Sequence, residues 1–444
     1  MKILFLTPQL PNPPHKGTTI RNFNLIKQLS KNHEVHLLSF VRSEDDLPWL
    51  DELRRYCRSV ETVIAPRHSM TRRLLAFLFS PLPDMAMRLP SPEFSARLEA
   101  LLARENFDIV QVEGIEMAQY GLAMKGYDLA STFLAGLGLH GGMLAGSSIT
   151  RSKLVFDDHN AEYVLQQRAY ETDRRYPTRW HRALYSFVQQ IKLRRYEAAV
   201  CRAADAVVAV SERDREALRD IVPDLPIAVV PNGVDSAYFS ALVPAGGYAI
   251  PPSKIRHLAS LVFTGTLDFR PNIDAVTWFC EEVLPLIKKE IFHIHFYIVG
   301  KSPTREVLRL GEDAAVTVTG YVSDVRPYIA QAKVYVVPIR MGAGTKLKVL
   351  EAMAMGIPVV STSLGAEGIA VTPDQDVLVA DDAASFAEKV VALMNNEPMR
   401  RQMSERGRAL MEARYDWQVI APELERVYAS LTSQSPTAEP GHAS

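Results

Sequence analysis

Two lysines and one acid stand close together in a stretch that is otherwise largely apolar, "MGAGTKLKVLEAMAMGIPVVST", Met341 to Thr362. Good helix formers fill its centre, and a glycine and a proline after them predict where a helix ends. Thr345 is the expected N-cap, so Lys346 and Lys348 would lie in the first turn. A helix N-terminus carries partial positive charge, so two lysines there predict that an anion such as a phosphate binds at this turn.

Two glycines and a single carboxylate fit the same interpretation. Gly342 and Gly344 would leave backbone N–H groups free to hold the phosphate. Glu351 is the only ionisable residue between Lys348 and Glu367. A buried carboxylate without a partner is costly, so it predicts a ligand hydroxyl, such as those of a ribose, or a salt bridge. The alternative is that both lysines are solvated and that Lys348 pairs with Glu351, a contact worth about 0.2 to 0.5 kcal/mol.

Short apolar strands alternate with helical patterns in both halves of the chain, which predicts parallel sheets with right-handed crossovers. We therefore expect an α/β fold of two Rossmann-like, doubly wound domains facing one another across a cleft, with ligands at the carboxyl ends of the strands. The expected strands are Lys2–Leu6, Glu34–Phe40, Asp108–Glu113, Leu154–Phe156 and Ala206–Val210 in the first half, and Ser260–Thr264, His295–Val299, Val316–Thr319, Val334–Pro338 and Pro358–Ser361 in the second.

Changes in composition give the expected domain boundaries. Residues 1–232 form the first domain and residues 255–410 the second. The prolines and glycines of residues 233–254 predict a linker between them. The final residues, 431–444, are polar and contain proline, so we expect them to be disordered.

The overall composition excludes several classes of protein. The formal net charge of -1 over 444 residues gives no reason to expect nucleic-acid binding, so an anion site must be local. Cys57, Cys201 and Cys280 lie far apart, which argues against a structural zinc site and a disulfide framework. The opening "MKILFLTP" reads as a strand and not as a signal peptide, and the uncharged run 129–150 contains five glycines. We expect a cytoplasmic protein.

Several strands of the second half end at a glycine, in "LVFTGTLDFRPN", "FYIVGKSP", "VTVTGYVSDV" and "PIRMGAGTK". Because the carboxyl ends of parallel strands share one edge of a sheet, these turns, Gly265 among them, outline a site of nucleotide size. In such a site the backbone of Tyr321 and Val322 could read a base. Glu351 could accept hydrogen bonds from two ribose hydroxyls, and the turn at Gly344 could hold a diphosphate.

These segments, together with "AVVAVSERDREAL", "VVPNGVDSAYF" and "VTVTGYVSDVRPYIAQAKVYVVPI", resemble the retaining glycosyltransferases of family 4, which have the GT-B architecture. The resemblance covers most of the chain. It implies transfer of a hexose-type sugar from a nucleotide-diphosphate sugar to an acceptor hydroxyl, with retention, no cofactor and no obligatory metal. It also implies that residues 255–410 bind the donor, and that a helix over residues 411–430 crosses back to the acceptor-side domain. Polysaccharide or glycoconjugate biosynthesis is the expected setting, with a saccharide or lipid-linked acceptor.

The resemblance can be followed position by position in the second half. Glu351 matches the glutamate that binds the ribose in the family. Ala343 stands where the family has a first acid, which contacts the donor sugar, and this departure leaves the transferred sugar open. Thr266 and Pro271 stand where the family has the Arg and Lys that grip the diphosphate.

A hypothesis follows about the missing positive charge. We expect Lys346 and Lys348, with Arg270 or Arg340, to supply it. The departing nucleoside diphosphate gathers negative charge in the transition state, and cations placed there would stabilise it.

The first half offers fewer candidates. Gly17 lies between a strand and a helix capped by Thr18 or Thr19, where the family keeps a glycine loop against the donor phosphates. His159 matches a family position that points toward the donor sugar. Glu113 is a weaker candidate. The adjacent Asp157 and Asp158 point to opposite faces of a strand, so they would chelate a metal poorly.

Other readings stay open. "GLGLHG", Gly136 to Gly141, matches the dinucleotide fingerprint, but too few residues follow it for a good crossover helix, which argues against an NAD-dependent oxidoreductase. A non-catalytic nucleotide-sugar-binding subunit is the alternative that Ala343 leaves open. Residues 67–88 mix four arginines with an apolar block. They would form a surface helix or an interfacial segment at the inner face of an anionic membrane.

Overall fold

The structure is a computed structural model that describes residues 1–67, 77, 80–127, 151–240, 260–342 and 344–433. The chain divides into two compact units. Unit 1 comprises Met1–Pro231 and Ala421–Ser444, and unit 2 comprises Asn232–Ile420. Outside the described residues lie the dinucleotide-like segment 136–141, residue 343, residues 434–444 and, within 67–88, residues 68–76, 78 and 79.

Unit 1 is built on a 7-stranded parallel sheet with the order β3-β2-β1-β4-β5-β6-β7. Its central strand β1 is buried on both faces, because Leu4 and Leu6 lie in one core cluster while Ile3 and Phe5 point to the other side. The strands are β1 Lys2–Thr7, β2 Glu34–Val41, β3 Ser59–Ile64, β4 Ile109–Glu113, β5 Lys153–Asp158, β6 Ala206–Ala209 and β7 Ile227–Val229.

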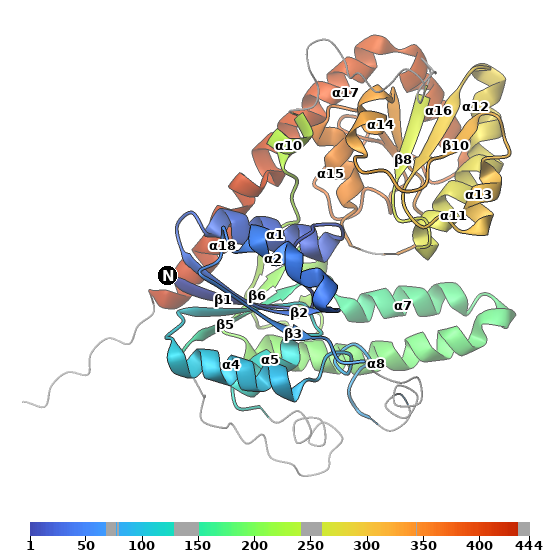
Figure 1. The fold of residues 1–444 in the computed structure, drawn as a ribbon. Helices are drawn as coiled ribbons and strands as arrows, with labels where there is room; N and C mark the ends of the chain where they lie inside the picture. The colour runs from blue at the N-terminus through green and yellow to red at the C-terminus, as the bar shows by residue number, and fades with distance from the viewer. Residues whose placement is uncertain (68–76, 78–79, 128–150, 241–259, 343, 434–444) are drawn as a thin grey trace, which may run out of the picture. The chain divides into compact units, whose positions relative to one another are not determined.

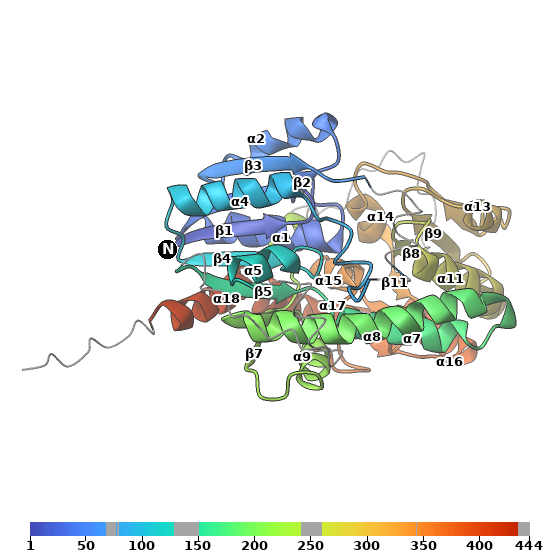
Figure 2. The ribbon, with the colours of Figure 1, turned by 90° about the horizontal axis from the view of Figure 1, so that it is seen from below.

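Helices cover both faces of this sheet (Figures 1 and 2). Helices α4, α5 and α8 pack on one face, where Phe94, Tyr120 and Leu193 join the core, and α1 lies on the other. The long helix α8 pairs with α7 as a helical hairpin. The helices are α1 Gly17–Leu29, α2 Leu50–Leu53, α4 Pro92–Arg104, α5 Ala118–Met124, α7 Glu162–Asp173, α8 Trp180–Ala203, α9 Glu212–Arg219 and α18 Trp417–Thr432, with short 3-10 turns at Glu44–Trp49 and Pro177–Arg179.

Unit 2 is built on a 6-stranded parallel sheet with the order β10-β9-β8-β11-β12-β13. Its strands are β8 Ser260–Thr264, β9 His295–Val299, β10 Val316–Val318, β11 Val334–Val337, β12 Val359–Ser361 and β13 Leu378–Val379. Its helices are α10 Ser236–Ser240, α11 Arg270–Trp278, α12 Leu284–Glu290, α13 Arg305–Leu310, α14 Arg326–Gln331, α15 Leu347–Ala354, α16 Ala383–Asn395 and α17 Glu397–Leu410, with π-helical turns at Phe279–Val283 and Met411–Tyr415.

The predicted fold class is confirmed, and each predicted strand overlaps an observed one. The sequence analysis missed the edge strands β3, β7 and β13, because edge strands carry a weaker apolar pattern than central ones. The helix expected to run unbroken from Met411 begins only at Trp417. Asp416 has extended backbone angles there, and its carboxylate accepts hydrogen bonds from the backbone N–H groups of Ser236 and Gln418.

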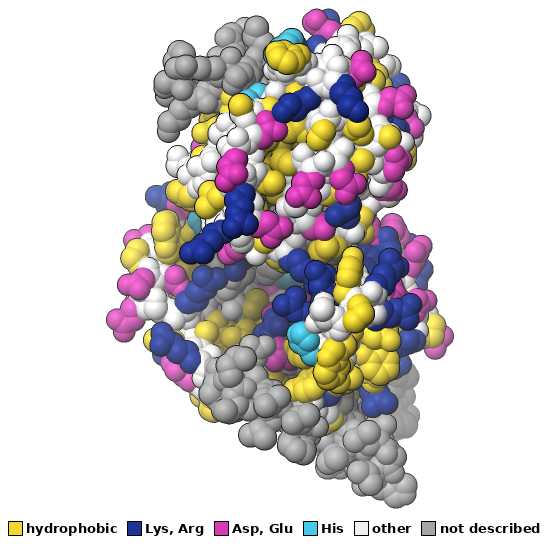
Figure 3. Space-filling model, turned by 90° about the vertical axis from the view of Figure 1, so that its right-hand side faces the viewer, with side chains coloured by type: hydrophobic (Ala, Val, Ile, Leu, Met, Phe, Trp, Pro, Cys, Tyr) yellow, Lys and Arg dark blue, Asp and Glu magenta, His cyan; other side chains and the backbone are white. Residues whose placement is uncertain are grey.

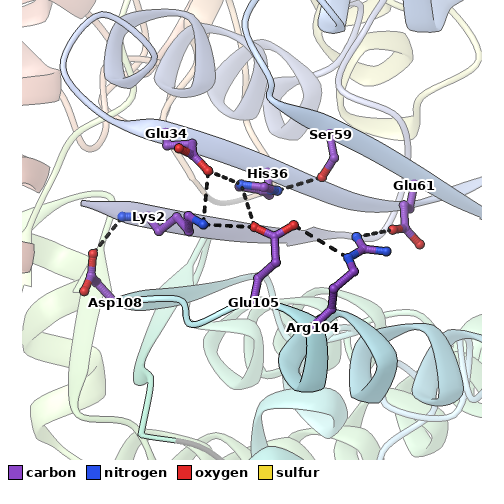
Figure 4. Close-up of polar contacts among 8 residues, drawn as sticks. All are labelled: Lys2, Glu34, His36, Ser59, Glu61, Arg104, Glu105 and Asp108. Carbon is purple, nitrogen blue, oxygen red and sulfur yellow. Dashed lines mark hydrogen bonds and ion pairs between the residues drawn. The ribbon is translucent and has the colours of Figure 1, made fainter.

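A polar network ties together the amino ends of β1, β2 and β3 and the end of α4 (Figure 4). Nζ of Lys2 lies 3.4 Å from Glu34 Oε1 and 3.1 Å from Glu105 Oε2. The ring of His36 lies between Glu34 and Ser59, at 3.0 and 2.7 Å. Glu34, His36 and Glu105 are close enough to share a cation, but the Lys2 ammonium already pairs with both carboxylates. We interpret this network as structural, since it lies at the amino edge of the sheet.

Among the described residues, no helix has both the length and the apolar composition needed to cross a membrane.

Candidate functional site

The carboxyl edge of the unit 2 sheet is built around glycines. Gly265 follows β8, Gly300 follows β9 and Gly320 follows β10. A Cβ on Gly300 would lie 1.7 Å from the carbonyl oxygen of Gly265, so no side chain fits between these two strand ends. The glycines therefore keep the backbone open at the edge where parallel sheets bind ligands.

Lys348 is held directly against this edge. It lies in the first turn of α15, and its Nζ donates a 2.9 Å hydrogen bond to Oδ1 of Asn272. The ammonium lies 3.9 Å from the ring centroid of Phe263, and a Cβ on Gly265 would come within 2.9 Å of it. Asn272 is itself oriented by a hydrogen bond to the carbonyl of Thr266. The cation is thus fixed at the end of β8.

The environment of Lys348 disfavours its charge. Burial lowers the pKa of Lys348 to about 7, with Glu351 opposing the effect and Lys346 adding to it. A bound anion would reverse this shift, because it would favour the charged ammonium. The side chain is therefore set up to become charged when an anion binds.

Glu351 lies one helical turn after Lys348. Burial raises its pKa to about 7, and Lys348 opposes that shift. Among the described residues, its carboxylate has no hydrogen bond and no ion pair within 4 Å, so the Lys348–Glu351 ion pair that the sequence allowed does not form. The neighbouring Tyr335 hydroxyl is engaged by Thr264, whose Oγ1 lies 2.5 Å away. The carboxylate of Glu351 remains available to a ligand.

The turn before α15 departs from the prediction in one respect. Lys346, not Thr345, is the N-cap, and its extended backbone delays the start of the helix to Leu347. Nζ of Lys346 donates a 2.5 Å hydrogen bond to the carbonyl of Gly344. Gly342 and Gly344 both have positive φ, at 105° and 74°, which requires glycine. The buried hydroxyl oxygen of Thr345 has no hydrogen-bond partner among the described residues.

The remaining predicted donor-binding residues are more exposed. Arg340 forms a two-point ion pair with Asp274, at 3.1 and 2.9 Å, and lies over the ring of Trp278, so its charge is already matched. Arg270 is the first residue of α11. Tyr321 is 73% exposed in the loop after β10, and the adjacent Val322 packs partly on the core.

The carboxyl edge of the unit 1 sheet holds a second cluster. Nε2 of His159 lies 2.7 Å from Oε2 of Glu113, which is fully buried. Gln111 donates a 2.6 Å hydrogen bond to the other carboxylate oxygen, so both oxygens of Glu113 are fixed. The His159 ring lies against Gly114, where a Cβ would be 3.5 Å from Nδ1.

The pKa of His159 results from opposing effects. Burial lowers the pKa of His159. The hydrogen bond and the charge of Glu113, together with the charge of Asp157, raise this pKa by more than burial lowers it, so the net pKa lies above the ordinary value. The Glu113–His159 pair therefore favours the protonated ring.

An arginine supplies the positive charge of this cluster. The buried Arg21 binds both oxygens of Asp157, with contacts of 2.8 to 3.1 Å, and donates to the carbonyl of Pro231. The ligand atoms of Glu113, Asp157 and His159 lie within 4.8 Å of one another, which is close enough for a metal. Because Arg21 already engages Asp157, the absence of a metal stays our prediction. Asp158 lies on the other face of the strand, as strand alternation requires, where burial and the nearby carboxylate of Glu197 raise its pKa.

Sequence reasoning missed several residues of both clusters. Arg21 carried no signal, because its partner lies 136 positions away. Asn272 follows Arg270 in "DFRPN", but only the fold brings it to Lys348. Gly17 was expected between the strand and the helix, but it is the first residue of α1, and Lys16, not Thr18 or Thr19, is the N-cap.

Known structures define the class of the fold. A sucrose-phosphate synthase of Thermosynechococcus elongatus matches with a TM-score of 0.67 at 18% identity, over 98% of this chain and 100% of that one. HepE of Anabaena, solved in complex with UDP, matches with a TM-score of 0.63 at 15% identity, over 97% of this chain and 100% of that one. The fold is the GT-B fold of glycosyltransferases, as predicted.

Sequence comparison then identifies the family. The profile described as Glycosyltransferase Family 4 matches residues 16–238, and that described as Glycosyl transferases group 1 matches residues 259–396. The chain belongs to glycosyltransferase family 4, which confirms the predicted family. It is a glycosyltransferase.

Two relatives show the range of similarity. A 44.6 kDa protein in the cps region of Klebsiella pneumoniae is 21% identical over 427 residues, 94% of this chain and 96% of that protein. The phosphatidyl-myo-inositol mannosyltransferase of Mycobacterium tuberculosis is 30% identical over 213 residues, which is 46% of this chain and 53% of that protein.

Proposed function

We propose that this glycosyltransferase uses a nucleotide-diphosphate sugar as donor and transfers a hexose-type sugar to an acceptor hydroxyl with retention of configuration. The observation that carries the proposal is the arrangement at the end of β8. A half-buried lysine at the Gly265 turn and a carboxylate without a hydrogen-bond partner lie one helical turn apart on α15.

The two groups match the two parts of a nucleoside diphosphate. Lys348 would bind the diphosphate, together with the backbone N–H groups of Gly344 and Thr345. Glu351 would accept hydrogen bonds from the ribose hydroxyls. The unpartnered hydroxyl of Thr345 offers one more hydrogen bond to the phosphates.

Stabilisation of the leaving group is the main catalytic task of this site. As the bond to the sugar breaks, negative charge accumulates on the departing diphosphate, and a positioned ammonium stabilises that charge. Lys348 would supply this without a metal, with support from Lys346 and Arg270. Retention then requires no side-chain nucleophile if the leaving phosphate accepts the proton of the acceptor hydroxyl on the same face of the sugar.

At the carboxyl edge of the unit 1 sheet, we propose that the Glu113–His159 pair binds a sugar hydroxyl. Nδ1 of His159 can form a hydrogen bond with a sugar hydroxyl while Glu113 holds Nε2 of the same ring. Glu113 is then a positioning residue, since it acts through His159.

The proposal is tested with the purified chain and a panel of nucleotide sugars. Thermal shift identifies the donor, because a ligand at a hundred times its Kd stabilises by about 2.7 kcal/mol. Release of nucleoside diphosphate in the presence of a chelator is expected, and NMR of the glycoside formed with an acceptor should show the donor's anomeric configuration. Binding of a donor without any release of diphosphate, or an inverted product, would refute the proposal.

A further inference from the structure

The helical hairpin of unit 1 exposes an apolar stripe along α8. Trp180, Leu184, Phe187 and Ile191 are 66%, 50%, 43% and 40% exposed. Their spacing of four, three and four residues places them within an arc of about 60° on the helix surface. The opposite side of α8 is already buried, since Leu193 lies in the unit 1 core. Packing inside unit 1 therefore does not account for the stripe.

Aromatic rings of the preceding segment extend this surface. Tyr170 of α7 lies 5.3 Å from the ring of Phe187, and Tyr176, at the turn between the helices, is 49% exposed. Arg174 and Arg179 lie over these two tyrosine rings, at 5.6 and 4.6 Å. We call Tyr170, Tyr176, Trp180, Leu184, Phe187 and Ile191 the hairpin patch.

The hairpin carries strong positive charge in a chain that is almost neutral. Residues 168–195 contain eight Lys or Arg and only two acidic residues, against a net charge of -1 for all 444 residues. One of the acids, Asp173, is buried and lies 3.8 Å from Arg179. Figure 3, which faces the tip of the hairpin, shows Lys and Arg side chains gathered around exposed hydrophobic ones.

A second segment reaches the same hairpin. Phe77 stacks on Tyr185 of α8 at 5.4 Å, and Lys192 donates a 2.8 Å hydrogen bond to its carbonyl. Phe77 belongs to residues 67–88, for which the sequence analysis left an interfacial role open.

We propose that the hairpin patch docks this protein on an anionic phospholipid bilayer. Exposed Trp, Tyr and Phe side chains favour the boundary between headgroups and acyl chains, and Arg side chains bind lipid phosphates. A second copy of the chain is the poorer occupant, because two such surfaces would bring like charges together. This inference goes beyond the transfer reaction, since it concerns where the protein acts.

The experiment is co-sedimentation of the full chain with vesicles. One set is phosphatidylcholine alone, and the other is equal parts phosphatidylcholine and phosphatidylglycerol. We expect binding to the anionic vesicles only, weakened by added salt because the contact is partly electrostatic. Equal binding to both sets, or to neither, would overturn the proposal.

Two double variants separate the parts of the surface. Trp180→Ser with Phe187→Ser removes apolar contacts, and Arg174→Gln with Arg175→Gln removes charge. Each should lower the partition coefficient at least about tenfold. The matched controls are Phe292→Ser, at a 93% exposed residue of unit 2, and Arg54→Gln with Arg55→Gln, directly after α2. Both should bind like the parent.

Further measurements exclude the other occupants. Hydrolysis of the soluble donor should be unchanged in the variants, which shows that they fold. Trp fluorescence should shift to the blue on anionic vesicles, and Trp180→Phe should remove most of that shift. If the patch variants sediment like the parent, or if they instead abolish self-association or binding to an acidic protein, the surface serves a protein and the proposal is wrong.

Discussion

Replacement of Lys348 with methionine tests the proposed donor site most directly. Methionine keeps an unbranched side chain beside Phe263 but removes the charge and the hydrogen bond to Asn272. If Lys348 stabilises the departing diphosphate, kcat should fall on the order of a hundredfold. Lys289→Met is the matched control, because Lys289 is exposed on α12, which precedes the amino end of β9. It should leave kcat unchanged.

The depressed pKa of Lys348 adds a second, independent readout. With a pKa of about 7, only about one tenth of the lysines carry the proton at pH 8, and a bound diphosphate should restore it. Binding of a nucleoside diphosphate at pH 8 should therefore take up about 0.9 proton per site. Glu351 is already ionised at this pH, so it adds little.

Calorimetry in buffers with different ionisation enthalpies measures this uptake. The binding enthalpy should change with buffer enthalpy for the parent chain, and Lys348→Met should lose that dependence. Turnover of Lys348→Met within a factor of about two of the parent would refute the catalytic assignment. A binding enthalpy that does not depend on the buffer in the parent would refute the charge change.

Three other outcomes are expected. Glu351→Gln should raise the KM for the donor by about tenfold to a hundredfold, because hydrogen bonds to a charged acceptor are worth about 1.5 to 3 kcal/mol. With a donor that carries deoxyribose in place of ribose, the KM should differ less between Glu351→Gln and the parent. Glu113→Gln should lower the His159 pKa measured by NMR, since burial would then act without the opposing carboxylate. The raised pKa of His159 stabilises the folded chain fully at pH values below the unfolded-state pKa of about 6.5, and this stabilisation is lost as the pH rises through the folded-state pKa. The difference in unfolding free energy between the parent and Glu113→Gln should therefore narrow with rising pH. A difference that widens contradicts the ion pair. Gly300→Ala should destabilise unit 2 by about 3 kcal/mol or more in denaturant unfolding, because its Cβ would clash with backbone. Gly407→Ala in α17 should not, because a Cβ there would meet only the Met353 side chain, at 3.4 Å or more.

The sequence by itself determined the secondary-structure order and indicated the sheet edge at which we propose that the donor binds. Apolar strands and helices alternate, and glycines close the strands, so the parallel sheets and their binding edge followed from local pattern. Glu351 was noticeable because it is an acid in an apolar helix. These features depend on near neighbours in the chain, which the sequence displays directly.

Only the tertiary structure decided which charges are available. Arg340 looked like a phosphate ligand, but Asp274, 66 positions away, already pairs with it. Lys348 gains its orientation from Asn272, 76 positions away, and loses its ordinary pKa through burial. In unit 1, Gln111 contacts both Glu113 and Tyr428, which is 317 positions away. Long-range packing sets such partners and the loss of solvent around them, so no local pattern in the sequence could have predicted them.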